Sequence, residues 1–158
     1  MPGKKTNNKV MARKFSTIKA DAHLKEAYSA IKKNLEGPPH SPGLVALDKA
    51  GKYAGVLTID DFMNELARLY RVACDKPRKM NWFESFSDQC ELIGIKQVAD
   101  IMSGKRLSVR ESDDFEKSCE LILKDKLSLL TVVNEKAEPV GIITRRKVLE
   151  EVAPRMLA

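Results

Sequence analysis

The sequence has few of the residues from which catalytic and metal centres are most often built. Its 158 residues include two histidines and three cysteines, and no two cysteines have the C-x-x-C spacing of a zinc or redox site. Cys74, Cys90 and Cys119 are an odd number of widely spaced thiols, which favours a reducing cytoplasm. No paired carboxylates or nucleophile–base spacing stands out either. We therefore expect a cytoplasmic protein that is not an enzyme, has no catalytic residues and holds no metal.

Long apolar runs are also lacking. No stretch approaches the roughly 18–20 apolar residues that span a bilayer, and the start of the chain has no signal-peptide core. Hydrophobic residues make up 43% and charged residues 32% of the chain, as in soluble globular proteins. We expect no membrane partner, and a chain that folds as one domain or as two small halves.

The net charge of +6 is unevenly distributed. Residues 1–14 contain five basic residues and no acid, while the other 144 residues hold 23 basic and 22 acidic side chains. A nucleic-acid-binding body would show a basic face of its own with interleaved aromatics, and aromatics make up 6% of this chain. We expect residues 1–8 to be a solvated, flexible basic tail, and weak nucleic-acid binding through it is an alternative function.

The sequence contains an internal repeat. Val10-Met11 and the segment FSTIKADAHLKEA correspond to Ile101-Met102 and RLSVRESDDFEKS, at an offset of 91 residues. Further along, LVALDKAGKYAGVLTIDDF corresponds to LTVVNEKAEPVGIITRRKV, at an offset of 86 residues. A Pro/Gly-rich loop at 37–43 in the first copy absorbs the difference, because loops tolerate insertions best.

Both copies predict the order strand, helix, strand, strand, helix. Apolar residues recur at helical spacing after each acidic helix start, and two short apolar segments flank a polar turn in each copy. Such short strands are not stable singly, so the apolar faces of the two sheets should pack together. The prediction is an α+β fold of two β-α-β-β-α repeats, at 9–73 and 96–158. Trp82, Phe83 and Phe86 predict a packed helix in the linker, 74–95.

Each copy ends its second strand with the pattern Gly-apolar-apolar-Thr-x-x-charged: GVLTIDD at 55–61 and GIITRRK at 141–147. The threonine precedes a helix, whose unpaired N–H groups and dipole favour a phosphate. A carboxylate three residues later, Asp61, could accept hydrogen bonds from ribose hydroxyls. The same spacing is also close to a capping box, in which Thr58 and Asp61 bond to each other's backbone. The spacing alone favours the cap.

The duplicated pattern resembles a tandem pair of CBS (cystathionine-β-synthase) domains, the arrangement called a Bateman module. The resemblance covers roughly 9–73 and 96–156 and rests on VM and DIM, IKADAHLKEA and VRESDDFEKS, VALDKAG and VVNEKAE, and the two Thr motifs. It implies two repeats related by a pseudo-twofold axis. It also implies a regulatory or sensor module that binds AMP, ADP, ATP or S-adenosylmethionine between the repeats, forms a homodimer and acts on an unknown protein target.

The resemblance implies two composite clefts, each joining the Thr motif of one copy to the strands of the other. The better cleft would combine Thr58, Asp60, Asp61, Ser108, Val109, Leu127, Ser128 and Leu130. The other would combine Thr144, Arg146, Lys147, Thr17, Ile18, Ser41 and Leu44. Here the chain departs from the family, because Lys147 stands where the ribose-binding carboxylate is expected. An ammonium cannot accept from hydroxyls, so Lys147, with Arg145 and Arg146, would suit an anion instead.

A second hypothesis is an interaction protein, a dimerising scaffold whose clefts hold no ligand. The two hypotheses differ in whether the cleft at Asp61 accepts a nucleotide or is filled by the protein's own side chains.

Overall fold

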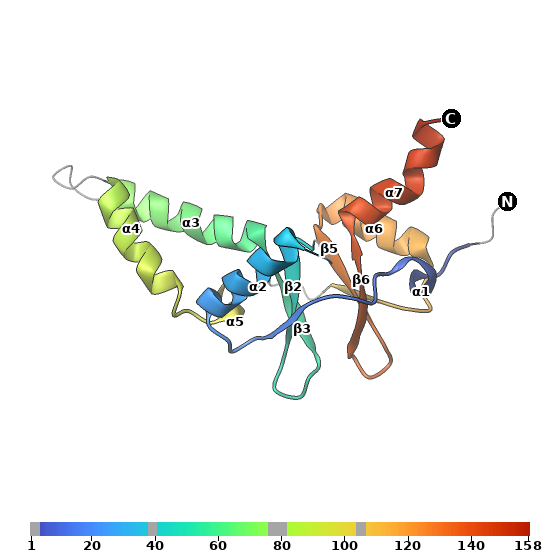
Figure 1. Ribbon diagram of the computed structural model, residues 1–158, viewed down its shortest axis with the longest axis horizontal. Helices are drawn as coiled ribbons and strands as arrows, with labels where there is room; N and C mark the ends of the chain where they lie inside the picture. Colours follow the sequence, from blue (N-terminus) through green and yellow to red (C-terminus); the bar gives the residue numbers. More distant parts are fainter. Residues whose placement is uncertain (1–3, 38–40, 76–81, 104–106) are drawn as a thin grey trace.

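A computed structural model describes residues 4–37, 41–75, 82–103 and 107–158. The order of elements in it confirms the duplicated unit (Figure 1). The first unit consists of β1 (Thr17–Lys19), α2 (Leu24–Glu36), β2 (Gly43–Leu47), β3 (Tyr53–Thr58) and α3 (Ile59–Cys74). The second consists of β4 (Ser108–Arg110), α6 (Phe115–Asp125), β5 (Leu129–Val133), β6 (Pro139–Thr144) and α7 (Arg145–Met156). The additional helices are α1 (Asn7–Val10), α4 (Trp82–Ile93) and α5 (Val98–Ile101).

Three expected features lie partly outside the described residues. These are positions 1–3 of the basic tail, 38–40 of the Pro/Gly-rich loop, and 76–81 of the linker.

Each repeat forms a three-stranded sheet, in the orders β1-β2-β3 and β4-β5-β6. The first two strands of each sheet are parallel, and a parallel pair needs a crossover, which α2 and α6 provide. The last two strands are antiparallel hairpins. The two sheets lie side by side in Figure 1, with α3 and α7 on the same side of the molecule.

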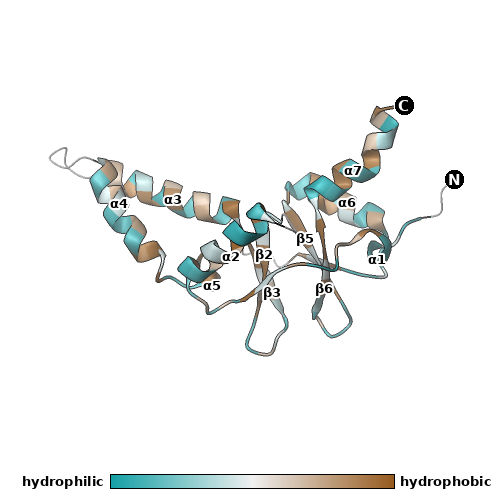
Figure 2. Ribbon diagram, viewed as in Figure 1, coloured by the Kyte–Doolittle hydropathy of each residue, from teal (hydrophilic) through white to brown (hydrophobic). Residues whose placement is uncertain are grey.

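Alternation along the strands separates the core into three clusters. Leu44 and Leu57 pack with the helices of the first repeat, and Leu130 and Ile143 with those of the second. The neighbouring strand residues face the other way, and they join the two sheets through a third cluster. Its buried members are Val45, Val56, Leu129 and Ile142. The expected packing of sheet against sheet is therefore confirmed, and Figure 2 shows the apolar residues along both sets of strands, with hydrophilic residues at the hairpin tips.

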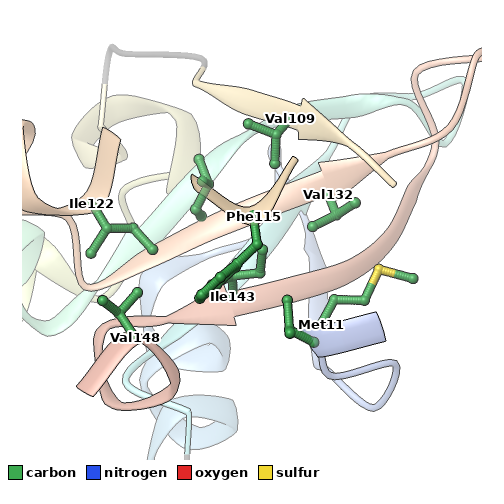
Figure 3. Packing of buried hydrophobic residues seen from close by; sticks show 9 residues of the cluster. Met11, Val109, Phe115, Ile122, Val132, Ile143 and Val148 are labelled. Atoms are coloured by element: carbon green, nitrogen blue, oxygen red, sulfur yellow. The ribbon is translucent and has the colours of Figure 1, made fainter. Parts of the chain in front are cut away.

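The leading segment of each repeat packs on the other repeat. Val10 and Met11 lie in the core of the second repeat (Figure 3), and Ala12 exchanges two backbone hydrogen bonds with Ile142, at 2.8 and 2.9 Å. Val98 and Met102 likewise pack in the core of the first repeat. This exchange ties the two halves into one body.

The two Thr motifs have the same spacing, and the glycine that begins each motif lies against the leading segment of the other repeat. A Cβ on Gly141 would lie 2.6 Å from the Met11 sulfur, and one on Gly55 would lie 3.1 Å from the Met102 sulfur. Because Gly55 and Gly141 have no side chain, the methionine of each leading segment can pack directly against the strand.

Residues 4–8 contact the second repeat through Thr6 and Asn7, although Lys4, Lys5 and Asn8 are exposed as their charge and polarity predict. Asn7 is fully buried, donates a hydrogen bond to the Arg110 carbonyl at 2.8 Å and accepts one from the Ser118 hydroxyl at 2.7 Å. The Lys5 ammonium pairs with Glu151 at 2.7 Å. A run of positive charge suggests a solvated tail. It gives no sign that an asparagine within the run is buried and supplies both a hydrogen-bond donor and an acceptor to the interior.

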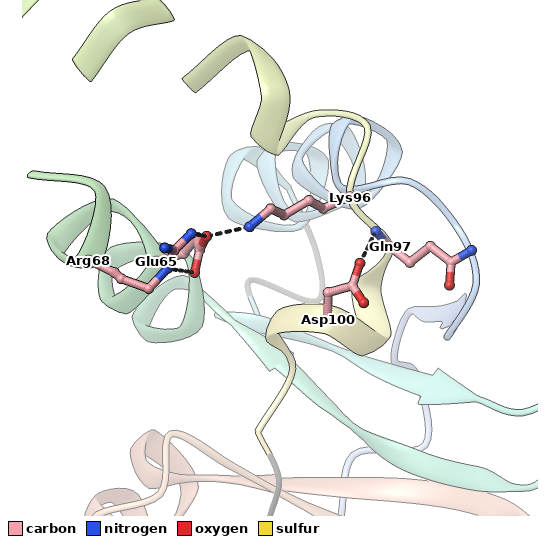
Figure 4. Close-up of polar contacts among 5 residues, drawn as sticks. All are labelled: Glu65, Arg68, Lys96, Gln97 and Asp100. Atoms are coloured by element: carbon pink, nitrogen blue, oxygen red, sulfur yellow. Dashed lines mark hydrogen bonds and ion pairs between the residues drawn. The ribbon is translucent and has the colours of Figure 1, made fainter. Parts of the chain in front are cut away.

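Helix α4 follows the first repeat and packs against α3. The rings of Tyr70 and Trp82 meet edge to face at 5.2 Å, and Phe86 packs against the core of the first repeat. Nearer the sheets, the Glu65 carboxylate accepts hydrogen bonds from Arg68, at 2.6 Å, and from Lys96, at 2.8 Å (Figure 4). Of the three aromatic residues expected to anchor the linker helix, Phe86 packs against the core, while Trp82 and Phe83 are 46% and 56% exposed.

Candidate functional site

The start of α3 carries the residues that the sequence singled out. Thr58 caps the helix: its hydroxyl accepts from the Asp61 N–H at 3.4 Å, and its own N–H donates to Asp61 Oδ2 at 2.8 Å. The cap favoured by the spacing is thus present. A carboxylate offers about four lone-pair sites, so this cap leaves Asp61 able to accept further hydrogen bonds.

Asp61 lies partly inside the protein, and this affects its charge. Burial raises the pKa of the Asp61 carboxyl, while hydrogen bonds from Thr58 and from the Ser103 backbone act in the opposite direction. The nearby Asp60 carboxylate raises it further. A donor that pairs with Asp61 therefore stabilises an ionised group that burial disfavours.

A composite cleft adjoins this helix start. It has a volume of about 140 Å³ and takes residues from both repeats. The first repeat contributes Tyr53, Val56, Thr58, Asp60 and Asp61. The second, with the segment leading into it, contributes Ser103, Leu107, Lys126, Leu127, Ser128 and Leu129. Five of the eight residues expected at the better cleft thus lie together: Thr58, Asp60, Asp61, Leu127 and Ser128.

The other three expected residues do not line this cleft. Val109 and Leu130 are 2% and 0% exposed and pack in the core of the second repeat, beneath α6. Ser108 lines a separate surface hollow with Arg110 and Asp113. The cleft instead receives Leu107, which precedes Ser108, and Leu129, which precedes Leu130. Because side chains alternate along a strand, the one-residue error at Leu130 exchanged the core face for the cleft face.

Sequence reasoning also missed Tyr53, Val56, Ser103 and Lys126. Val56 could have been found from strand alternation, since it follows the glycine in the first Thr motif. Lys126 has no such signal: it ends α6 in the left-handed conformation, with φ 52°, where glycine is the usual residue. Non-glycine residues in this conformation cluster at functional sites, and here the conformation sets the lysine on the wall of the cleft.

Arg145 reaches the rim of the cleft from the second repeat. Its guanidinium donates a hydrogen bond to the Ser128 hydroxyl and lies 3.9 Å from the Asp60 carboxylate, and its backbone N–H donates to the Ser128 carbonyl at 3.2 Å. The expectation that Arg145 accompanies Arg146 and Lys147 is therefore wrong. Consecutive residues at the start of a helix point about 100° apart, so Arg145 faces the first cleft while its two neighbours face the second.

The second cleft has a volume of about 310 Å³ and includes Thr144, Arg146 and Lys147 as expected. Its other walls are Val10, Met11, Ala12, Ile142 and Glu150. Both cations are paired within α7: Arg146 with Glu150 at 3.1 Å and Lys147 with Glu151 at 3.3 Å.

The remaining residues expected at the second cleft lie elsewhere. Leu44 is fully buried in the core of the first repeat, where Ile18 packs against it. Ser41 is buried and bonded to the Gly43 backbone, and Thr17 is exposed on β1. Thr17, Ile18 and Leu44 correspond to Ser108, Val109 and Leu130, which do not line the first cleft either, whereas Ser41 corresponds to Leu127, which does. For Leu44, as for Leu130, strand alternation is the reason.

The rest of the described chain offers little that suggests other chemistry. Within the described ranges, no group of three or more His, Cys, Asp or Glu side chains is arranged to hold a metal ion. Burial raises the pKa of the Cys90 and Cys119 thiols, which keeps both thiols protonated at neutral pH. None of the helices that the structure describes is long and apolar enough to cross a membrane.

Comparison with known families identifies the repeats. The model of the CBS domain matches residues 8–68 and 98–154. The chain belongs to the CBS-domain family. As a tandem CBS pair, it has the architecture of a Bateman module. A comparison with curated protein sequences finds no significant match.

Solved CBS-pair structures share the fold. The CBS-pair protein CBSX2 from Arabidopsis thaliana has a TM-score of 0.70 at 20% identity, covering 98% of this chain and 99% of that one. CBSX2 in complex with AMP gives 0.67 at 21% identity, covering 97% and 98%. The cytosolic domain of the Mg²⁺ channel MgtE in complex with ATP gives 0.63 at 20% identity, covering 90% of this chain and 46% of that one.

Proposed function

We propose that this CBS pair is a regulatory module that binds an adenosine-containing ligand in the cleft beside Thr58 and Asp61. The observation that carries the proposal is the composite wall. The Asp61 carboxylate, which can accept from ribose hydroxyls, lines the same cleft as the apolar residues Leu127 and Leu129 of the other repeat, which suit a base. CBSX2 and MgtE, which share this fold, were crystallised with AMP and ATP.

The size of the cleft constrains how such a ligand sits. Its volume of about 140 Å³ is well below the roughly 300 Å³ at which small-molecule pockets usually begin. The cleft can therefore enclose only part of a nucleotide, and we propose that the base lies inside and the phosphate end at the rim. A ligand that touches both repeats can shift their arrangement by its differential affinity, which is how a module of this kind regulates a partner.

Isothermal titration with AMP, ADP, ATP and S-adenosylmethionine tests the proposal. Asp61→Asn is the most informative variant. Its remaining side-chain oxygen can still accept from the Thr58 N–H, while an NH₂ group, which donates, replaces the second carboxylate oxygen. We expect this variant to remain folded and to lose about tenfold or more in affinity, since hydrogen bonds to charged groups contribute about 1.5–3 kcal/mol each. Lys147→Ala, in the second cleft, should weaken binding far less. Failure of all four ligands to bind at millimolar concentration would refute the proposal.

The alternative is a scaffold that binds no nucleotide, and two contacts favour it. Asp61 already bonds to Thr58, and Arg145 already spans the rim between Ser128 and Asp60. If these contacts fill the cleft permanently, Asp61→Asn changes no binding property. The titration above separates the two functions.

Either function agrees with a homodimer. Exposed apolar residues recur at equivalent places on α3 and α7, since Met63 and Tyr70 match Leu149 and Met156 at the 86-residue offset of the repeat. Both helices lie on the same side of the molecule (Figure 1). We propose that a second copy of the chain covers these exposed apolar residues of α3 and α7.

A further inference from the structure

We infer that Arg145 selects phosphorylated over unphosphorylated adenosine ligands at the cleft beside Asp61. The inference rests on the proposed function and adds a specificity-determining residue to it. Arg145 belongs to the second Thr motif, yet its guanidinium contacts Ser128 and Asp60, both of which line the first cleft. The second Thr motif therefore contributes to both clefts: it supplies Arg145 to the rim of the first and Arg146 and Lys147 to the second.

The position of Arg145 is fixed by its backbone, while its charge is weakly held. Its N–H donates to the Ser128 carbonyl, and Thr144 caps the helix that it begins. The guanidinium lies 3.9 Å from Asp60, and the two side chains are 61% and 72% exposed. Exposed pairs of this kind stabilise a protein little, because water and salt screen them. A phosphate can therefore displace Asp60 from the guanidinium at small cost.

The chemistry of the rim suits a phosphate better than a neutral group. A guanidinium donates two parallel hydrogen bonds to phosphate oxygens, a geometry that ammonium groups do not offer. Lys126 adds a second cation to the same cleft, held there by its left-handed backbone. The negative charges of Asp60 and Asp61 balance the positive charges of Arg145 and Lys126 when no ligand is bound. A bound phosphate replaces Asp60 as the partner of Arg145.

Titrations of adenosine and AMP into four forms of the full chain test this. The forms are the unchanged protein, Arg145→Gln, Arg145→Lys and Arg155→Gln. Arg155→Gln is the matched control, because it removes the same charge from the same helix, about 15 Å along the helix axis from Arg145 and outside both clefts. We expect Arg145→Gln to weaken AMP binding about tenfold and adenosine binding less than twofold. Arg145→Lys should recover part of the loss, and Arg155→Gln should change neither ligand by more than twofold.

A further variant tests whether Asp60 competes with phosphate for Arg145. Asp60→Asn removes the partner that competes with phosphate, so it should increase the preference for AMP over adenosine. The inference is overturned if the unchanged protein binds adenosine and AMP equally, or if Arg145→Gln weakens both by the same factor. Equal effects of Arg145→Gln and Arg155→Gln on AMP would also overturn it, because they would indicate a general charge effect. If the unchanged protein binds neither ligand, the proposed function itself fails, and the inference fails with it.

Discussion

The exchange of leading segments between the repeats makes a strong prediction at Gly141. A Cβ at this position would lie 2.6 Å from the Met11 sulfur, 2.9 Å from Met11 Cγ and 3.1 Å from the Ala12 carbonyl oxygen. The sulfur end of the side chain can move, but the Ala12 backbone is held by its two hydrogen bonds to Ile142. We therefore expect Gly141→Ala to lower the free energy of unfolding by about 1–3 kcal/mol, the usual cost of overpacking.

Two further glycines provide graded controls for this substitution. At Gly55 the nearest atom to an added Cβ is the Met102 sulfur at 3.1 Å, followed by atoms at 3.5 Å, so Gly55→Ala should cost less. At Gly37 the nearest atom is 3.9 Å away, so Gly37→Ala should change the stability by less than about 1 kcal/mol and can increase it.

Urea unfolding followed by circular dichroism, at one protein concentration, measures all three variants. At about 2–4 °C per kcal/mol for a chain of this size, thermal melting should show the same order. The double variant Met11→Ala/Gly141→Ala should lose less stability than the sum of the single variants, because Met11→Ala removes the clash. Strict additivity, or equal losses at Gly141 and Gly37, would refute the packing of the leading segment on the second repeat.

Three other predictions follow from the described contacts. Ala137 has φ 61° in the turn where the first repeat has Gly51, so Ala137→Gly should raise the free energy of unfolding by about 1 kcal/mol in the same urea assay; a loss would contradict this backbone geometry. Hydrogen bonds from Arg68 and then Lys96 lower the pKa of Glu65 to about 2, so its stabilising effect is complete above its ordinary pKa near 4.5 and is lost as the pH falls towards 2. Glu65→Gln should thus destabilise the protein at pH 7, with a difference from the unchanged protein that shrinks below pH 4; a difference independent of pH would contradict the ion pair. Met63→Lys and Leu149→Lys should each shift a dimer towards monomer in light scattering coupled to size exclusion, and a monomeric unchanged protein would refute the proposed homodimer.

The duplicated fold could be predicted from the sequence because the pattern is long and repeated. Each copy has an apolar periodicity, a polar turn and a Thr motif in the same order, and these agree with the observed strands and helices. The two turns even share their chemistry, with Asp48 and Asn134 each accepting two backbone hydrogen bonds through the side chain.

The partner of a short segment could not be predicted in the same way. Residues 4–12 have too few apolar positions to show which half of the chain they contact, and their charge suggested a tail. Only the fold shows that Asn7 and Met11 fill the second repeat.

The sequence indicates where Thr58 and Asp61 lie at the start of α3, but not how Arg145 at the start of α7 or the strand residues are oriented. Thr58 and Asp61 are placed by the cap of α3, which the spacing reveals. Val109 and Leu130 were assigned to the cleft although they face the core, because a three- to five-residue strand carries too few alternations to show which face is which. The placement of Arg145 depends on the angle between successive residues of a helix and on contacts with residues distant in sequence, which the sequence alone does not show.

The most direct test of the nucleotide site is a crystal structure of the chain grown with millimolar AMP. The account predicts density in the cleft between the repeats, with ribose oxygens within hydrogen-bond distance of Asp61 and the adenine beside Leu127 and Leu129. A cleft without ligand density under these conditions, with Arg145 still bonded to Ser128 and beside Asp60, would contradict it.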